Sequence, residues 1–151
     1  MQNIPLLQKI LIRHEGQQFE IYKDTMGLKT CGIGHLCVGA QADAAVGTPV
    51  SQEQVQAYFD SDIQRSIALA MNYVPQLAAL DDVRWVVVVS LAFNLGNRLG
   101  EFHQTLAALN SGDYVRAATQ LQDSAWYGEV GRRGPELCAA LNSGIFGFPT
   151  D

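Results

Sequence analysis

Residues 13–35 decide the fold of this chain, and they read RHEGQQFEIYKDTMGLKTCGIGH. Within this stretch, residues 19–22 have the composition of a short strand and residues 24–27 that of a turn. Residues 28–33 can then run back beside the first strand. The stretch therefore predicts a β-hairpin that follows directly on the first helix of the chain.

Helices are predicted on both sides of this hairpin. Before it, apolar residues recur at helical spacing after a capping Asn3, which predicts an amphipathic helix over residues 3–15. After it, a capping box that begins at Ser51 indicates the start of a long helix, which should run to about residue 72. Pro75 then stops that helix, because proline lacks an N–H and its ring clashes with the preceding turn.

The remainder of the chain has helical patterns only. Asp81 and Asp82 form an acidic cap before residues 83–95, whose run of valines has strand propensity. We nevertheless expect a buried central helix there, because its length, its cap and the lack of a matching strand nearby outweigh that propensity. Three further helices are predicted at residues 102–110, 113–123 and 132–142.

These elements predict an α+β fold in a single domain, residues 1–151. A small β-containing N-terminal lobe, about residues 14–60, would be joined by the long helix to a helical C-terminal lobe, about residues 61–151. The N-terminal helix belongs to the same domain, in addition to the two lobes. A chain of 151 residues has no room for a second independent domain.

Composition limits the classes of function. Ten basic and fifteen acidic side chains give a net charge of −5, so the chain lacks the electrostatic footprint of a protein that binds nucleic acid or anionic lipid. No segment resembles a signal peptide or a transmembrane helix, so we expect no stable membrane insertion. Three cysteines without disulfide-framework spacing indicate free thiols in a reducing compartment.

Three polar positions and a glycine-rich motif within residues 13–35 carry a family resemblance. Glu15 is followed nine residues later by Asp24, which is followed six residues later by Thr30 and then by Gly-Ile-Gly-His at residues 32–35. This pattern resembles the phage-type lysozymes of glycoside hydrolase family 24. Two weaker matches extend the resemblance over nearly the whole chain, the segment at residues 93–96 and the Ser-Ala-Trp-Tyr segment at residues 124–127.

The resemblance implies a hydrolase that cleaves the β-1,4 bond between N-acetylmuramic acid and N-acetylglucosamine in peptidoglycan, without a metal or an organic cofactor. Glu15 would protonate the glycosidic oxygen, while Asp24 and Thr30 would hold the attacking water on the opposite face. Physical chemistry adds support for Glu15, because a helix C-terminus disfavours negative charge and so favours the protonated acid. The structural alternatives are a solvated helix-end glutamate, a turn-capping aspartate and a strand threonine.

The resemblance also implies residues that surround the catalytic groups. Arg133 is expected to pair with Glu15, and His35 to make a structural hydrogen bond or ion pair. The resemblance further implies a set of sugar-contacting residues. For its two apolar members, Leu36 and Phe93, packing in the core is the alternative. That set comprises Leu36, Phe93, Asn94, Thr105 and Gln120.

Other kinds of site are less consistent with the sequence. His14, Cys31, His35 and Cys37 are close in sequence, but they lack zinc-ligand spacing. No cysteine lies in a nucleophile motif, and core packing is the better explanation for all three. The alternative functions are a lytic transglycosylase, which would leave an anhydro sugar, and a wall-binding module that has lost turnover.

The leading hypothesis is a monomeric phage endolysin, or the wall-penetrating lysozyme domain of a virion protein. It would remain in the host cytoplasm until it is released to the periplasm or cell wall. Because no signal peptide is visible, the sequence predicts that a free endolysin of this kind needs a holin as its partner.

Overall fold

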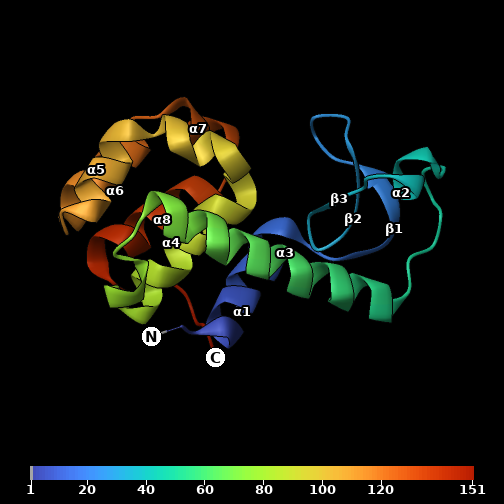
Figure 1. Ribbon diagram of the computed structural model, residues 1–151, viewed down its shortest axis with the longest axis horizontal. Coiled ribbons are helices and arrows are strands. Elements are labelled where there is room, and N and C mark those ends of the chain that lie inside the picture. Colours follow the sequence, from blue (N-terminus) through green and yellow to red (C-terminus); the bar gives the residue numbers. More distant parts are fainter. Residues whose placement is uncertain (1) are drawn as a thin grey trace. The chain divides into compact units, whose positions relative to one another are not determined.

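A computed structural model describes residues 2–151, which form eight α-helices and a three-stranded antiparallel sheet (Figure 1). The predicted α+β class is therefore confirmed. Residues 11–65 make up one compact unit, here called the β unit, and residues 2–10 with 66–151 make up a second, the helical unit. The elements are α1 (Ile4–Glu15), β1 (Gln18–Lys23), β2 (Lys29–Gly32), β3 (His35–Leu36), α2 (Ala40–Asp43), α3 (Gln52–Tyr73), α4 (Asp82–Leu95), α5 (His103–Asn110), α6 (Tyr114–Gln122), α7 (Ala125–Glu129) and α8 (Arg133–Ser143), with 3-10 helices η1 (Leu77–Ala79) and η2 (Gly96–Glu101).

The sheet of the β unit has the order β1-β2-β3, and one row of side chains crosses all three strands. Tyr22 on β1 is paired with Thr30 on β2, which is paired with Leu36 on β3. Because residues directly opposite one another share a face, these three side chains lie on the same face of the sheet. The neighbouring residues Ile21 and Cys31 are buried and lie on the opposite face.

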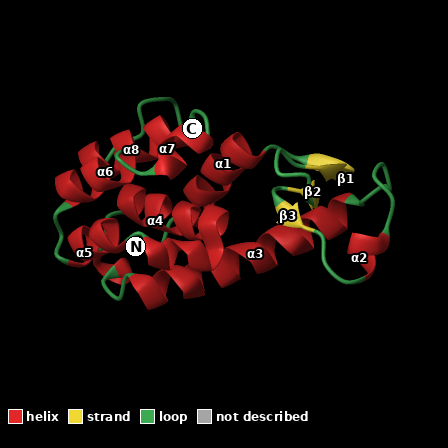
Figure 2. Cartoon of the chain, turned by 90° about the horizontal axis from the view of Figure 1, so that it is seen from above, coloured by secondary structure: helices red, strands yellow, loops and turns green. Residues whose placement is uncertain are grey.

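That opposite face packs against the first part of α3, which lies beside the three short strands in Figure 2. His35, paired with Cys31 in the sheet, stacks its ring on Tyr58 of α3 with the centroids 4.2 Å apart. Its Nδ1 lies 2.7 Å from a carboxylate oxygen of Asp62, which also pairs with Arg65. The contact between His35 and α3 is thus a partly buried polar one within a mainly apolar interface.

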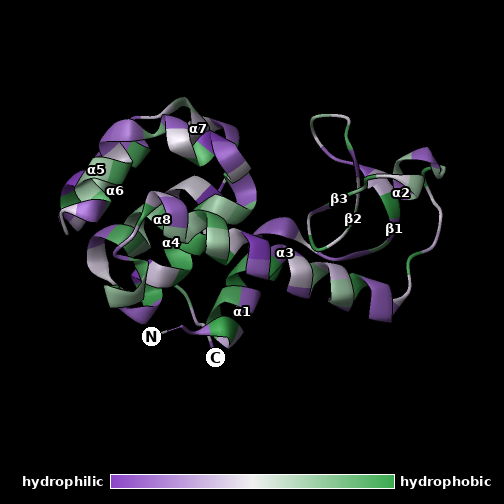
Figure 3. Ribbon diagram, in the orientation of Figure 1, coloured by the Kyte–Doolittle hydropathy of each residue, from purple (hydrophilic) through white to green (hydrophobic). Residues whose placement is uncertain are grey.

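The long helix α3 begins at the capping box that the sequence predicts. The Gln54 N–H donates to the Ser51 hydroxyl at 3.1 Å, and the Ser51 N–H donates to the Gln54 side chain at 3.0 Å. Hydrophilic and hydrophobic residues alternate along the helix (Figure 3). Its buried face in the β unit includes Val55, Phe59 and Ile63. The amphipathic pattern in the sequence therefore corresponds to the face that covers the sheet.

In the helical unit, α4 is a helix despite its valine run, as the length and the acidic cap predict. The side chain of Asp81 accepts from the Arg84 N–H at the first turn, and all residues from Trp85 to Ala92 are buried. Burial on every side favours branched apolar residues, and this gain outweighs their modest helix propensity. None of the helices in residues 2–151 combines the length and the apolar character that a bilayer span requires.

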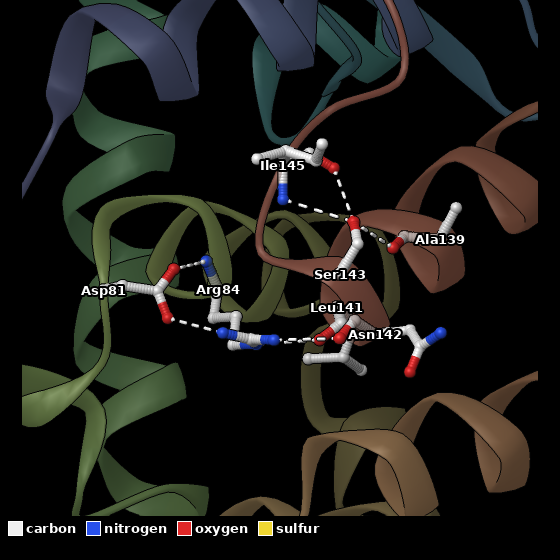
Figure 4. Close-up of polar contacts among 7 residues, drawn as sticks. All are labelled: Asp81, Arg84, Ala139, Leu141, Asn142, Ser143 and Ile145. Carbon is white, nitrogen blue, oxygen red and sulfur yellow. Dashed lines mark hydrogen bonds and ion pairs between the residues drawn. The ribbon is translucent and has the colours of Figure 1, made fainter.

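Arg84 ties α4 to the C-terminal end of α8 (Figure 4). Its Nε donates to the Leu141 carbonyl at 2.8 Å and its Nη2 donates to the Asn142 carbonyl at 2.9 Å. The final carbonyls of a helix lack partners within the helix, so a cation there both pairs them and complements the helix dipole. Asp81 and the ring of Tyr114 hold the guanidinium in place from two further directions.

Several short elements were not predicted from the sequence. These are β3, α2, α7 and the two 3-10 helices. Gly128 and Gly134 indicate only a turn between the last two predicted helices, whereas residues 125–129 form α7. A single helical turn has too few residues to show a periodic pattern, so its formation depends on packing, here through the buried Trp126.

Candidate active site

Glu15 is the last residue of α1, and its side chain lies over the turn between β2 and β3. The helix ends because Gly16 adopts a left-handed conformation, with φ at +72°. A Cβ atom built on Gly34 would be 2.5 Å from Oε2 of Glu15, so the carboxyl group occupies the space above that glycine. Glu15 is half-buried, and the backbone of Gly34 forms one wall of its position.

Substitution of Gly34 tests how closely this wall positions Glu15. Because the sequence predicts Glu15 as the general acid, Gly34→Ala should lower turnover by roughly 100-fold, the effect that a displacement of about 1 Å of a reacting group can have. Gly39→Ala is the matched control, because Gly39 has φ at +59° against +61° for Gly34, but a Cβ atom added to Gly39 would meet nothing within 4 Å. Equal activities of the two variants, measured at equal folded fractions by circular dichroism, would contradict the proposed packing of Glu15.

Asp24 and Thr30 are both held by the peptide groups of one residue, Leu28. Oδ1 of Asp24 accepts from the N–H of Met26 and from the N–H of Leu28, each at 2.9 Å. The carbonyl of Leu28 in turn accepts from the Asp24 N–H at 2.9 Å and from the Thr30 hydroxyl at 3.0 Å. The turn between β1 and β2 therefore fixes the carboxylate and the hydroxyl relative to each other.

This arrangement determines what the two groups offer to a ligand. Because the Thr30 hydroxyl donates its hydrogen to Leu28, its oxygen is left as an acceptor. In the β1–β2 turn, both hydrogen bonds to the Asp24 side chain go to Oδ1, so Oδ2 is the acceptor that remains. One water molecule could donate one hydrogen to each of these oxygens. The geometry suits a bound water whose own lone pair stays available for attack.

Tyr22 interacts electrostatically with both Glu15 and Asp24. The pKa of its phenol is raised by burial first, and then by the negative charges of Glu15 and Asp24. Both carboxyl groups therefore lie near the same hydroxyl, on the face of the sheet that carries Thr30. The sequence identifies Tyr22 only as a strand residue, because nothing in its spacing distinguishes it from an ordinary β-former.

The predicted sugar-contacting residues fall into both units. Leu36 lies in the β unit, beside Thr30 in the sheet, and is 50% exposed. Thr105 and Gln120 line a pocket of about 370 Å³ in the helical unit, together with Phe102 and Trp126 among others. The structure thus brings these two predicted residues together at a concave surface, which is the usual form of a binding site.

The other predicted residues of the helical unit have structural surroundings. The Asn94 side-chain oxygen accepts from the Trp126 indole at 2.8 Å, so its carbonyl orients a residue that lines the pocket. Phe93 is half-buried in the last turn of α4. Arg133 is buried at the start of α8. The expected pairing of Arg133 with Glu15 remains a prediction.

The histidine, cysteine and acidic side chains of the described residues are not clustered as metal ligands would be, and the cysteines lie in the interior. Among residues 2–151 there is no group of three or more histidine, cysteine or acidic side chains that could hold a metal ion. All three cysteines are buried and free. Burial raises the pKa of Cys31 and of Cys138 to about 12, so these two thiols are protonated at neutral pH and are poor nucleophiles.

Comparison with known proteins gives a family and several relatives. The model of a family described as phage lysozyme matches residues 12–139. An endolysin of Acyrthosiphon pisum secondary endosymbiont phage 1 is 27% identical over 126 residues, which are 83% of this chain and 82% of the endolysin. The family match starts within α1 and ends within α8, so it includes both units.

Two relatives are much longer than this chain. The pre-baseplate central spike protein Gp5 of Enterobacteria phage T4 is 26% identical over 160 residues, which cover 91% of this chain and 28% of the spike protein. The peptidoglycan hydrolase gp36 of Pseudomonas phage phiKMV is 26% identical over 121 residues, which cover 80% of this chain and 13% of the hydrolase. The chain therefore corresponds to a small part of each of these two proteins.

Proposed function

Because the chain belongs to the phage lysozyme family, we propose that it is an N-acetylmuramidase that hydrolyses the β-1,4 bond between N-acetylmuramic acid and N-acetylglucosamine in bacterial peptidoglycan. The match spans both units, and one relative is named a peptidoglycan hydrolase. No metal or organic cofactor is needed for this reaction, because two carboxyl groups suffice to cleave a glycosidic bond.

Glu15 is proposed as the general acid. Its carboxyl group sits at the C-terminal end of α1, where the helix dipole favours the protonated form. In that form it donates a proton to the glycosidic oxygen as the bond to the anomeric carbon breaks. Half-burial against Gly34 keeps the group in one orientation, which a proton donor requires.

Asp24 and Thr30 are proposed to hold the attacking water. The single observation that carries this proposal is the Leu28 peptide, which bonds to both side chains and leaves one acceptor oxygen on each. A water that donates to Asp24 Oδ2 and Thr30 Oγ1 directs its lone pair away from both groups. As the water attacks the anomeric carbon, Asp24 removes its proton, and the configuration at that carbon inverts.

The main rival is a lytic transglycosylase, which cuts the same bond without adding water. The water proposed to bind Asp24 and Thr30 favours hydrolysis, because a transglycosylase adds no water. Digestion of purified peptidoglycan followed by mass spectrometry of the products separates the two reactions. We expect one reducing muramic acid end and one added water per cleavage. Products that carry an anhydro muramic acid in place of the reducing end would contradict the proposed reaction.

Two biological roles are consistent with the relatives. As a free endolysin, the protein would act as a monomer on the host wall after release from the cytoplasm through a holin. As a domain of a virion protein, it would open the wall during infection. The endolysin relative of similar length favours the first role, whereas the long spike relative shows that matching segments also occur within larger phage proteins.

A further inference from the structure

Tyr22 lies in the sheet in one row with two residues that are proposed or predicted for the site. The row Tyr22, Thr30 and Leu36 crosses β1, β2 and β3 on one face. Thr30 is the proposed water ligand, and Leu36 is a predicted sugar contact. Asp24 follows Tyr22 by two residues, directly after the end of β1, and its N–H donates to the Leu28 carbonyl that also accepts from the Thr30 hydroxyl. Tyr22 thus begins the row that carries the proposed chemistry.

The hydroxyl of Tyr22 is available to a ligand. Tyr22 is half-buried, whereas the preceding Ile21 is 2% exposed on the other face. Within residues 2–151, no side chain or backbone group forms a hydrogen bond with the Tyr22 hydroxyl. A half-buried phenol near two carboxyl groups has lost part of its contact with water, so a polar group of a ligand would restore a hydrogen bond to it.

We propose that Tyr22 is a further substrate-contacting residue of this site, whose hydroxyl donates a hydrogen bond to a hydroxyl or N-acetyl oxygen of the sugar bound between Glu15 and Asp24. This inference rests on the proposed function and adds a specific donor to it. It assigns Tyr22 to binding of the glycan rather than to the transfer of a proton.

The chemistry of the site favours a donor role toward the sugar. Burial raises the pKa of the phenol, and the negative charges of Glu15 and Asp24 raise it further, so the hydroxyl keeps its hydrogen. A donor to the attacking water would weaken that water as a nucleophile, because it would engage the lone pair that attacks. Sugar hydroxyl and amide oxygens accept hydrogen bonds without this disadvantage.

The experiment compares Tyr22→Phe with the parent protein in two backgrounds. Glycan binding is measured by titration calorimetry in the Glu15→Gln background, where turnover is suppressed, with a soluble uncross-linked peptidoglycan hexasaccharide. Kinetic constants are measured with the same glycan in the active background. Tyr73→Phe is the control, since the Tyr73 hydroxyl donates a long hydrogen bond of 3.4 Å to the Asn97 carbonyl in the helical unit.

We expect Tyr22→Phe to weaken glycan binding by roughly 2- to 12-fold, which corresponds to one neutral hydrogen bond. kcat/KM should fall by at least that factor, and the thermal unfolding midpoint should stay close to that of Tyr73→Phe. Unchanged Kd and KM in Tyr22→Phe, with an active parent protein, would overturn the role of Tyr22 alone. A parent protein that neither binds nor cleaves the glycan would overturn the proposed function together with it.

Discussion

Glu15→Gln is expected to lower the turnover of peptidoglycan by roughly 10²–10⁴-fold, the usual contribution of a general acid. Glutamine has nearly the same shape as glutamic acid, so it should fill the space over Gly34 without displacing β2 or β3. It cannot give up a proton to the glycosidic oxygen. Release of reducing ends from purified walls gives the rate, and co-sedimentation with the walls should show that binding persists.

Glu20→Gln provides the matched control for this substitution. Glu20 lies in the same unit, on β1, and its side chain is exposed. The substitution Glu20→Gln removes one negative charge from the β unit, as Glu15→Gln does when Glu15 is ionised. Activity of Glu15→Gln within a few-fold of Glu20→Gln, with normal thermal unfolding, would exclude Glu15 as the general acid.

Asp24→Asn is expected to reduce turnover by a similar factor, roughly 10²–10⁴-fold, because an amide cannot remove a proton from the attacking water. The amide oxygen of asparagine can still accept from the N–H groups of Met26 and Leu28, so the turn should keep its conformation. Thr30→Ser should have a milder effect, since serine keeps the hydroxyl that donates to Leu28. Thr30→Val should fall between these two.

If Asp24 and Thr30 hold the same water, the losses of activity caused by the two single substitutions should not multiply in the double variant. The double variant Asp24→Asn/Thr30→Val should lose less activity than the product of the two single losses, as residues that act as a unit do. Thr119→Val is the control, because the Thr119 hydroxyl also donates to a backbone carbonyl, that of Val115, on the exposed side of α6. Strictly multiplicative losses would show that the two residues act independently.

The secondary structure was largely predictable where the sequence carries a long repeat or a clear cap. The box at Ser51 and the acidic cap at Asp81 predict the starts of α3 and α4, and the structure shows the corresponding hydrogen bonds. The strand β3 was missed because its two residues cannot show a period, and it exists only through its register with Cys31 and Thr30. Such elements depend on tertiary contacts that local patterns do not encode.

The residues of the candidate site could be predicted from the sequence, but the hydrogen bonds and strand pairing that position them could not. The spacing of Glu15, Asp24 and Thr30 in the family motif selects the polar groups. The fixation of Asp24 and Thr30 by Leu28 is a backbone effect, for which any residue with a backbone N–H would suffice. Tyr22 was missed for a related reason. Its position opposite Thr30 results from the irregular pairing between Gln18 and Tyr22, which shifts the register of β1 against β2.

The stereochemistry of the first product tests the central claim most directly, because inversion requires a water held opposite Glu15. Proton NMR of glycan cleaved within the first minutes, before the sugar equilibrates between its anomers, gives the configuration at the new reducing end. The proposed binding of one water by Asp24 and Thr30 predicts that the α-anomer appears first, inverted from the β-linked substrate. Initial release of the β-anomer would contradict this account, since it would mean retention and make Asp24 a nucleophile.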